Sequence, residues 1–77
     1  MLLVTARRPA VTFTPRESRI LDLLRAGLPQ KDIAARLDIS PWTVKRHLEN
    51  ARRRHRVATT TQLAVLYART RGARRTS

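Results

Sequence analysis

Apolar residues recur at intervals of three and four positions in four separate stretches of this 77-residue chain. That spacing places them along one face of an α-helix. β-branched residues never alternate with polar ones over a run, so the pattern predicts no strand. We therefore expect an all-α fold whose helices cover about residues 15–26, 30–37, 41–54 and 61–70.

Capping residues mark the ends of these helices. Thr14 stands three residues before Glu17, the spacing of a capping box in which each side chain accepts from the other residue's backbone N–H. Ser40 is a second N-terminal cap. Gly27 is expected to end the first helix because glycine takes the left-handed conformation at little cost, and Asp38 tolerates the same conformation after the second helix.

The chain is strongly basic, with 17 Lys and Arg residues against 5 Asp and Glu and a net charge of +12. Residues 40–56 hold six of these cations and one acid, and more cations follow in the C-terminal part. Val44, Leu48 and Ala51 share one helical face that is expected to be buried. The opposite face presents Lys45, Arg46, Glu49, Arg52 and Arg53. Such a helix indicates a polyanionic partner: DNA, RNA or anionic lipid.

The composition also argues against several kinds of chemistry. The absence of cysteine removes disulfides, thiolate zinc sites and Cys nucleophiles. His47 and His55 have no third ligand nearby, so no metal is expected. No nucleophile, base and orienting group occur at usable spacing, so we expect neither an enzyme nor a cofactor. No apolar stretch is long enough for a membrane span or signal peptide, and the chain is expected in the cytoplasm, associated with the nucleoid.

The second and third predicted helices form a helix-turn-helix pattern, in which a short helix braces a second helix with a cationic outer face. Residues 13–28 contain the run Phe-Thr-Pro-Arg-Glu, and residues 31–50 end in Thr-Val-Lys-Arg-His-Leu-Glu-Asn. Together with Val57, Thr61 and Gln62, these blocks resemble the LuxR/GerE-type DNA-binding domain over about residues 13–68.

This resemblance implies a four-helix domain of a bacterial, sequence-specific transcription regulator that binds double-stranded DNA as a dimer. The third helix, about residues 41–54, would enter the major groove, and the fourth would form the contact between protomers. By position, the base-contact candidates are Lys45, Arg46 and Glu49. The backbone-contact candidates are Thr43, Asn50, Arg52, Arg53 and Lys31. The dimer-contact candidates are Leu63, Leu66 and Tyr67.

The chain departs from the family's pattern on both sides of the helix-turn-helix. Pro29 stands where a capping Ser or Thr is usual. After the third helix the family usually reads Lys-Leu-Gly-Val, whereas residues 54–57 read Arg-His-Arg-Val. His55 therefore replaces a core leucine, and Arg56 replaces the glycine of the turn.

Some candidates also have a structural interpretation. Glu49 could form a helical salt bridge with Lys45 or Arg53, four positions away on either side. Trp42, in the first turn of the third helix, is expected to pack against the neighbouring helix rather than to touch a thymine methyl group. The three dimer-contact candidates are equally compatible with a place in the core.

The predicted organisation is a single domain at residues 13–71, preceded by a flexible extension at 1–12 and followed by a basic tail at 72–77. We expect it to act without a receiver or ligand-binding domain. Two other functions remain open. The chain could be an interaction module that docks on another regulator or, like region four of a sigma factor, on RNA polymerase. It could also be a small RNA- or ribosome-binding protein.

Overall fold

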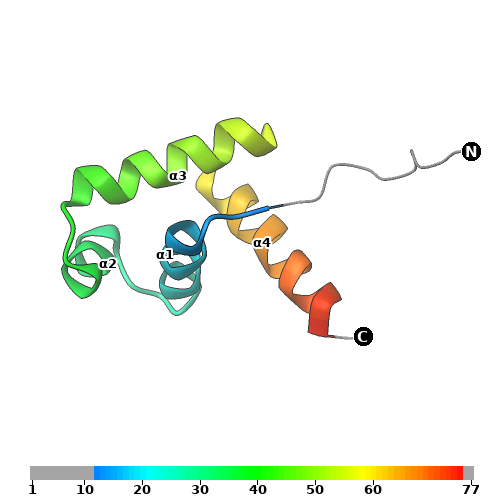
Figure 1. Cartoon of the computed structure of the whole chain (residues 1–77), viewed down its shortest axis with the longest axis horizontal. Coiled ribbons are helices and arrows are strands. Elements are labelled where there is room, and N and C mark those ends of the chain that lie inside the picture. Colours follow the sequence, from blue (N-terminus) through cyan, green and yellow to red (C-terminus); the bar gives the residue numbers. More distant parts are fainter. Residues whose placement is uncertain (1–11, 76–77) are drawn as a thin grey trace, which may run out of the picture.

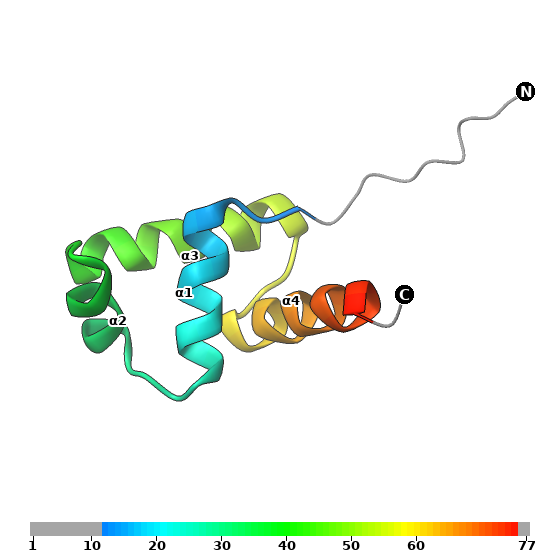
Figure 2. The same cartoon turned by 60° about the horizontal axis from the view of Figure 1, so that its bottom comes forward.

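The computed structural model describes residues 12–75, which form four helices and no strand. They are α1 (Pro15–Arg25), α2 (Gln30–Leu37), α3 (Pro41–His55) and α4 (Thr60–Arg75). α1 lies against each of the other three helices, and α2 packs mainly against α3 (Figure 1). Figure 2 shows α1 crossing α3, with α2 on one side of it and α4 on the other. The prediction of an all-α helix-turn-helix fold is confirmed.

The N-terminal caps form where the sequence predicts them. Thr14 Oγ1 accepts from the N–H of Glu17, and Glu17 Oε1 accepts from the N–H of Thr14, both at 3.0 Å. Ser40 Oγ accepts from the N–H of Thr43 at 3.0 Å at the start of α3. α2 begins without a side-chain cap because Pro29 occupies its N-cap position. The first turns of α1 and α3 are therefore fixed by local hydrogen bonds that the first turn of α2 lacks.

Two tight turns then set the path of the chain through the helix-turn-helix. Gly27 has a φ of +99°, and Asp38 has a φ of 59°. Both values lie in the left-handed region, in which a helix is ended by hydrogen bonds from the turn back to its last carbonyl groups. The N–H of Ile39, for example, donates to the carbonyl oxygen of Ala34 at 3.0 Å. α3 therefore leaves α2 at a sharp angle after a turn of only a few residues.

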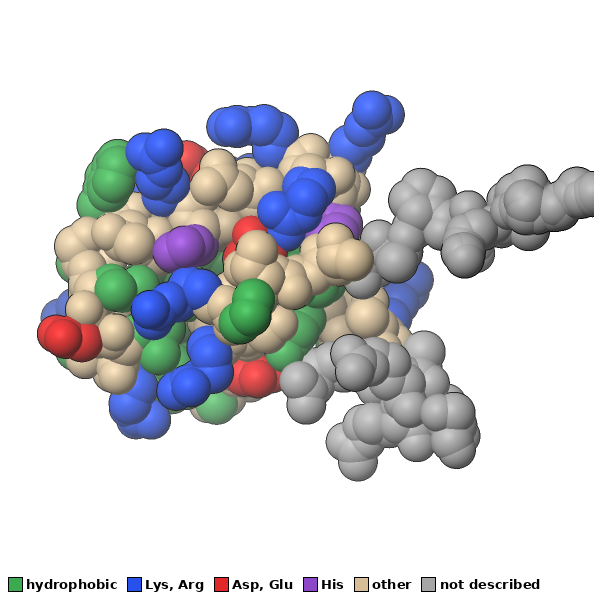
Figure 3. Space-filling view, viewed as in Figure 1, with side chains coloured by type: hydrophobic (Ala, Val, Ile, Leu, Met, Phe, Trp, Pro, Cys, Tyr) green, Lys and Arg blue, Asp and Glu red, His purple; other side chains and the backbone are tan. Residues whose placement is uncertain are grey.

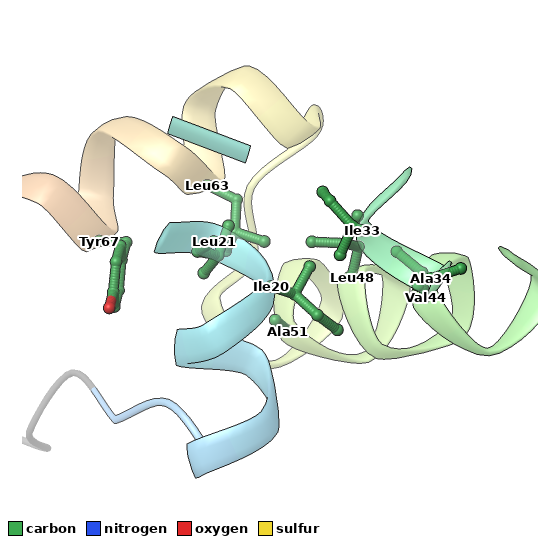
Figure 4. Packing of buried hydrophobic residues seen from close by; sticks show 9 residues of the cluster. All are labelled: Ile20, Leu21, Ile33, Ala34, Val44, Leu48, Ala51, Leu63 and Tyr67. Carbon is green, nitrogen blue, oxygen red and sulfur yellow. The ribbon is translucent and has the colours of Figure 1, made fainter. Parts of the chain in front are cut away.

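Nine residues drawn from all four helices form the buried core (Figure 4). They are Ile20, Leu21, Ile33, Ala34, Val44, Leu48, Ala51, Leu63 and Tyr67. The predicted inner face of α3 supplies three of them. Burying a large aliphatic side chain contributes about 1.5–3 kcal/mol, so this core holds α3 firmly by one face. The opposite face of α3 is left to solvent.

Two of the three dimer-contact candidates belong to this core. Leu63 is fully buried and points toward Leu21 of α1 (Figure 4). Tyr67 is 3% exposed, and its hydroxyl group donates to Asp22 Oδ1 at 2.8 Å. The stripe that suggested a contact surface is thus the side of α4 that packs on α1. The prediction that these two residues touch a second protomer is corrected, and Leu66, which is half-buried, remains a candidate.

α4 is longer than the sequence predicts. Its cap is a second reciprocal pair, in which Thr59 Oγ1 accepts from the N–H of Gln62 at 3.1 Å and Gln62 Oε1 accepts from the N–H of Thr59 at 3.3 Å. The helix continues through Gly72 to Arg75 instead of ending near residue 70. One glycine costs only about 1 kcal/mol in a helix interior, and the Ala and Arg residues around it are strong helix formers.

The expected flexible extension lies outside the described part of the chain except for Thr12, because that part omits residues 1–11 and 76–77. Residues 72–75 of the expected basic tail belong to α4. Thr12, the last residue of the predicted extension, is held by α3, as described below. Within residues 12–75 no helix has the length and apolar character needed to cross a membrane.

Candidate nucleic-acid interface

The outer face of α3 carries cationic side chains where the sequence places them. Lys45, Arg46 and Arg53 are exposed, whereas Val44 and Leu48 on the inner face are buried. Lys and Arg side chains project along the upper edge of the molecule in Figure 3, the edge that α3 occupies in Figure 1. α3 has 15 residues and therefore extends about 22 Å. The major groove of DNA is about 12 Å wide, which is wide enough to admit such a helix.

The base-contact candidates lie together on this face, around a shallow depression. Its lining residues are Trp42, Lys45, Arg46, Glu49, Asn50 and Arg53. Glu49 is half-buried and forms no ion pair with Lys45 or Arg53. The helical salt bridge that its spacing allows is therefore not formed. The Glu49 carboxylate is left among cations as an acceptor that can be reached from outside the chain.

Trp42 lies on the surface at the N-terminal end of this depression. Its side chain is 64% exposed, so the expected packing against the neighbouring helix is wrong. The reason is geometric: Trp42 precedes the buried Val44 by two positions, which turns it by about 200° around the helix axis. Arg46, one turn further along, places its Cζ 5.2 Å from the centroid of the indole ring, within the range of a cation–π interaction.

The backbone-contact candidates differ in how free their side chains are. Asn50 and Arg53 on α3 and Lys31 on α2 are exposed. Thr43 is half-buried, and its Oγ1 lies 2.9 Å from Ser40 Oγ, so part of its hydrogen-bonding capacity is used at the helix cap. These four residues remain candidates for contact with phosphate groups.

Arg52 also has a structural role. It is half-buried, and its Nη1 donates to the carbonyl oxygen of Ala58 at 3.0 Å. Its buried Nε has no hydrogen-bond partner among the described residues. The guanidinium group thus ties the end of α3 to the turn before α4. Contact of Arg52 with the DNA backbone stays a prediction.

A second cationic surface, which the sequence analysis missed, lies on the other side of α3. Thr14, Pro15, Arg16, Glu17, Arg19, Leu37, His47, Asn50 and Arg54 line an open groove between the start of α1 and α3. Arg16 and Arg19 are exposed there, and His47 is half-buried. In a charge count along the sequence, the negative charge of Glu17 offsets one of these neighbouring cations. In the folded chain, however, the Glu17 side chain is buried. The capping box is the signal that could have found them, because a carboxylate that caps its own helix is not free to pair with its neighbours Arg16 and Arg19.

A comparison with known protein families now adds to this geometry. Residues 11–67 match the family described as bacterial regulatory proteins, luxR family. The chain belongs to the LuxR family. Among its curated relatives is the nitrate/nitrite response regulator protein NarL of Escherichia coli, which is 41% identical over 61 residues, or 79% of this chain and 28% of the relative.

Two further relatives extend the LuxR comparison. The E. coli nitrate/nitrite response regulator NarP is 38% identical over 65 residues, covering 84% of this chain and 30% of NarP. The transcriptional regulatory protein FixJ of Rhizobium meliloti is 51% identical over 39 residues, covering 51% of this chain and 19% of FixJ. The chain thus spans less than a third of the length of these relatives. No solved structure is significantly similar to it.

One departure from the LuxR pattern, Arg56 in place of a glycine, lies in the turn after α3. Arg56 takes the left-handed conformation itself, with a φ of 57°. The N–H of Val57 then donates to the carbonyl oxygen of Arg52 at 3.1 Å, which completes the helix end. A non-glycine residue in this region costs about 1–2 kcal/mol, so the turn is preserved at the expense of strain.

The second departure, His55, is accommodated by the segment before α1. The His55 ring packs on Phe13 with the ring centroids 4.7 Å apart, and Phe13 meets Tyr67 edge-on at 5.1 Å. His55 Nε2 lies 2.7 Å from the carbonyl oxygen of Thr12; because a carbonyl can only accept, Nε2 donates. The histidine therefore fills an apolar position and fastens the chain entering α1 to the end of α3.

Proposed function

We propose that this chain is the DNA-binding part of a bacterial transcription regulator and that α3 enters the major groove of double-stranded DNA. One observation carries the proposal: in a chain of the LuxR family, α3 has a buried apolar face and an exposed cationic face. The relatives NarL, NarP and FixJ bear the names of regulators, which agrees with it. An α-helix that presents long hydrogen-bonding cations is suited to reading base edges.

The side chains divide into base readers and phosphate contacts. Lys45 and Arg46 donate to guanine O6 and N7, and Glu49 accepts from the N4 amino group of cytosine. The phosphate contacts come from Lys31, Thr43, Asn50, Arg52 and Arg53 and, on the far side of α3, from Arg16 and Arg19. Contacts of the second kind supply affinity and register without selecting a sequence.

We further infer that two copies bind one site through the exposed side of α4. Val65 is 49% exposed there, and Leu66 beside it is half-buried. Helix-turn-helix dimers read half-sites about 34 Å apart along the duplex, so the operator of such a dimer is partly palindromic. The contact between the two protomers must leave the outer face of both α3 helices free for DNA. α4 runs away from that face in Figure 1, so it can supply the contact.

Selection of bound duplexes from a random pool, followed by titration at several salt concentrations, tests the proposal on the full 77-residue chain. We expect a short, partly palindromic site, with a log–log salt slope of about −5 for each bound protomer if that protomer neutralises about six phosphates. The double variant Lys45→Ala/Arg46→Ala should lose the selected site. Arg25→Ala, which removes an exposed cation at the opposite end of α1, is the matched control and should keep it.

The other functional classes are outcomes of the same experiment. Equal affinity for duplex RNA and duplex DNA would identify an RNA- or ribosome-binding protein. Binding to RNA polymerase core without affinity for free DNA would identify a sigma-like module. A complex with another regulator that survives high salt and shows no DNA affinity would identify an interaction module. Each result would overturn the proposed function.

A further inference from the structure

The exposed indole ring of Trp42 is not explained by the fold. Trp42 and Val65 are the large hydrophobic residues that the described part of the chain leaves exposed, at 64% and 49%. A tryptophan side chain has more apolar surface than any other, and burying it is strongly favourable. Here the ring lies in the first turn of α3, at one end of the depression that holds all three base-contact candidates.

Arg46 is held by this ring. Its Cζ lies 5.2 Å from the indole centroid, one helical turn further along α3. An arginine stacked on an aromatic face loses part of its rotational freedom before any ligand arrives, and its planar fork of donors is then oriented. An oriented fork is what a bidentate contact with guanine O6 and N7 needs. Trp42 therefore influences how Arg46 contacts its ligand.

Resting on the proposed entry of α3 into the major groove, we propose that Trp42 and Arg46 together read a thymine–guanine combination. Arg46 donates to guanine O6 and N7, and the Trp42 ring packs on the C5 methyl group of a thymine within two base steps. The N-terminal residues of a recognition helix are the ones that meet base edges. Among the groups that base pairs present in the major groove, the thymine methyl is the apolar one, so it is the partner for an exposed indole.

The dimensions agree with two neighbouring bases. Base pairs are about 3.4 Å apart along each strand, so a ring and a guanidinium group separated by 5.2 Å meet bases one or two steps apart. The rest of the depression is lined by polar or charged side chains, Lys45, Glu49, Asn50 and Arg53. Trp42 is therefore the apolar contact in a surface that is otherwise suited to hydrogen-bond donors and acceptors.

The test replaces each thymine of the selected site in turn by deoxyuridine, which deletes only the C5 methyl group. For the wild-type chain, one position in each half-site should lower the affinity by about fourfold, the effect of losing one buried methyl group. Trp42→Ala should bind more weakly and lose this dependence, and Trp42→Phe should retain part of it. Arg25→Ala, which removes an exposed cation at the C-terminal end of α1, should retain it in full. Circular dichroism confirms that each variant is folded.

Coupling to Arg46 is measured with 7-deazaguanine, which removes the N7 acceptor. Its penalty at the guanine near the sensitive thymine should disappear in Arg46→Ala and shrink in Trp42→Ala. Trp42 is also the only tryptophan in the chain, so its emission reports its environment directly. We expect the emission of the wild-type protein to change on binding the selected duplex and not on binding free nucleotides.

The failures of the two proposals are distinguishable. If the wild-type chain selects no duplex, the proposed function is wrong. If it selects a site but every deoxyuridine duplex binds within about twofold of the parent, the thymine contact is wrong and the major-groove proposal stands. An unchanged emission spectrum in the selected complex, or a Trp42→Ala variant that weakens all duplexes by the same factor, would also overturn the thymine contact.

Discussion

Arg54, in the last turn of α3, forms an ion pair with Glu17, in the first turn of α1. The Glu17 side chain is 3% exposed and the Arg54 side chain 40%. The same carboxylate oxygen also accepts from the N–H of Thr14, so a single atom serves the helix cap and the ion pair. Arg54 further donates to the carbonyl oxygen of Thr12 at 3.4 Å. The C-terminal end of α3 is thereby fixed to the start of α1.

Arg54→Ala should destabilise the domain by about 2 kcal/mol, because it leaves a buried carboxylate without its cation. The value is below that of a fully buried pair because Arg54 is partly solvated. Adding Glu17→Gln should recover part of the loss, since glutamine still accepts at the cap and carries no charge. Urea unfolding measures both effects. Arg53→Ala, an exposed neighbour, is the control and should change the free energy of unfolding by less than about 0.5 kcal/mol. Additive single and double variants would contradict the coupling.

Arg56→Gly should stabilise the domain. Glycine removes the strain of a side chain in the left-handed conformation, about 1–2 kcal/mol. It also raises the conformational entropy of the unfolded chain, which offsets part of this stabilisation. The net expectation is about 0.5–1 kcal/mol, or a rise in the melting temperature of a few degrees, roughly 3–6 °C. Arg56→Ala keeps the strain and removes the same charge, so it should not raise the melting temperature. Equal shifts for the two variants would show that charge rather than backbone strain is responsible.

The contrast between Thr14 and Arg54 shows which parts of this structure can be predicted from sequence. The cap at Thr14 and the turn at Asp38 depend on neighbours within a few positions, so local patterns find them. The pair of Arg54 with Glu17 joins residues 37 positions apart, and no periodicity encodes it. Only the folded chain shows that Glu17 is engaged by the cap and by Arg54, whereas Arg16 and Arg19 are exposed.

For the same reason, the sequence predicts the position of some candidate site residues and not of others. Helical spacing assigns Lys45 and Arg46 to the outer face of α3, because Val44 must face the core. Spacing alone does not say whether the apolar stripe of α4, with Leu63 and Tyr67, faces its own core or a second protomer. It also cannot reveal that Arg52 reaches back to a carbonyl group beyond the helix end. Those outcomes depend on how the helices pack.

Lys45→Ala and Arg53→Ala should affect DNA binding in different ways. Lys45 is assigned to a base edge, so its loss should cost about 1–3 kcal/mol on the preferred site and relax selectivity at one position. Arg53 is assigned to phosphate, so its loss should weaken binding to all sequences alike and reduce the salt slope by about 1. Affinities for a panel of single-base variants of the selected site, at two salt concentrations, distinguish these patterns. If both substitutions scale every duplex equally, α3 does not read bases directly.

Val65→Asp should separate pairing of protomers from folding. Val65 is 49% exposed on α4, so a charge there leaves the core intact but opposes an apolar contact between two copies. We expect unchanged thermal unfolding, unchanged affinity for a half-site and a loss of cooperative binding to the full palindrome, measured by sedimentation and by titration of both duplexes. Leu63→Ala is the opposite case, because truncating this fully buried side chain should lower the free energy of unfolding by about 2–5 kcal/mol. The variant should therefore bind both duplexes more weakly because part of it is unfolded. Cooperative binding that persists in Val65→Asp would place the contact between protomers elsewhere than on this side of α4.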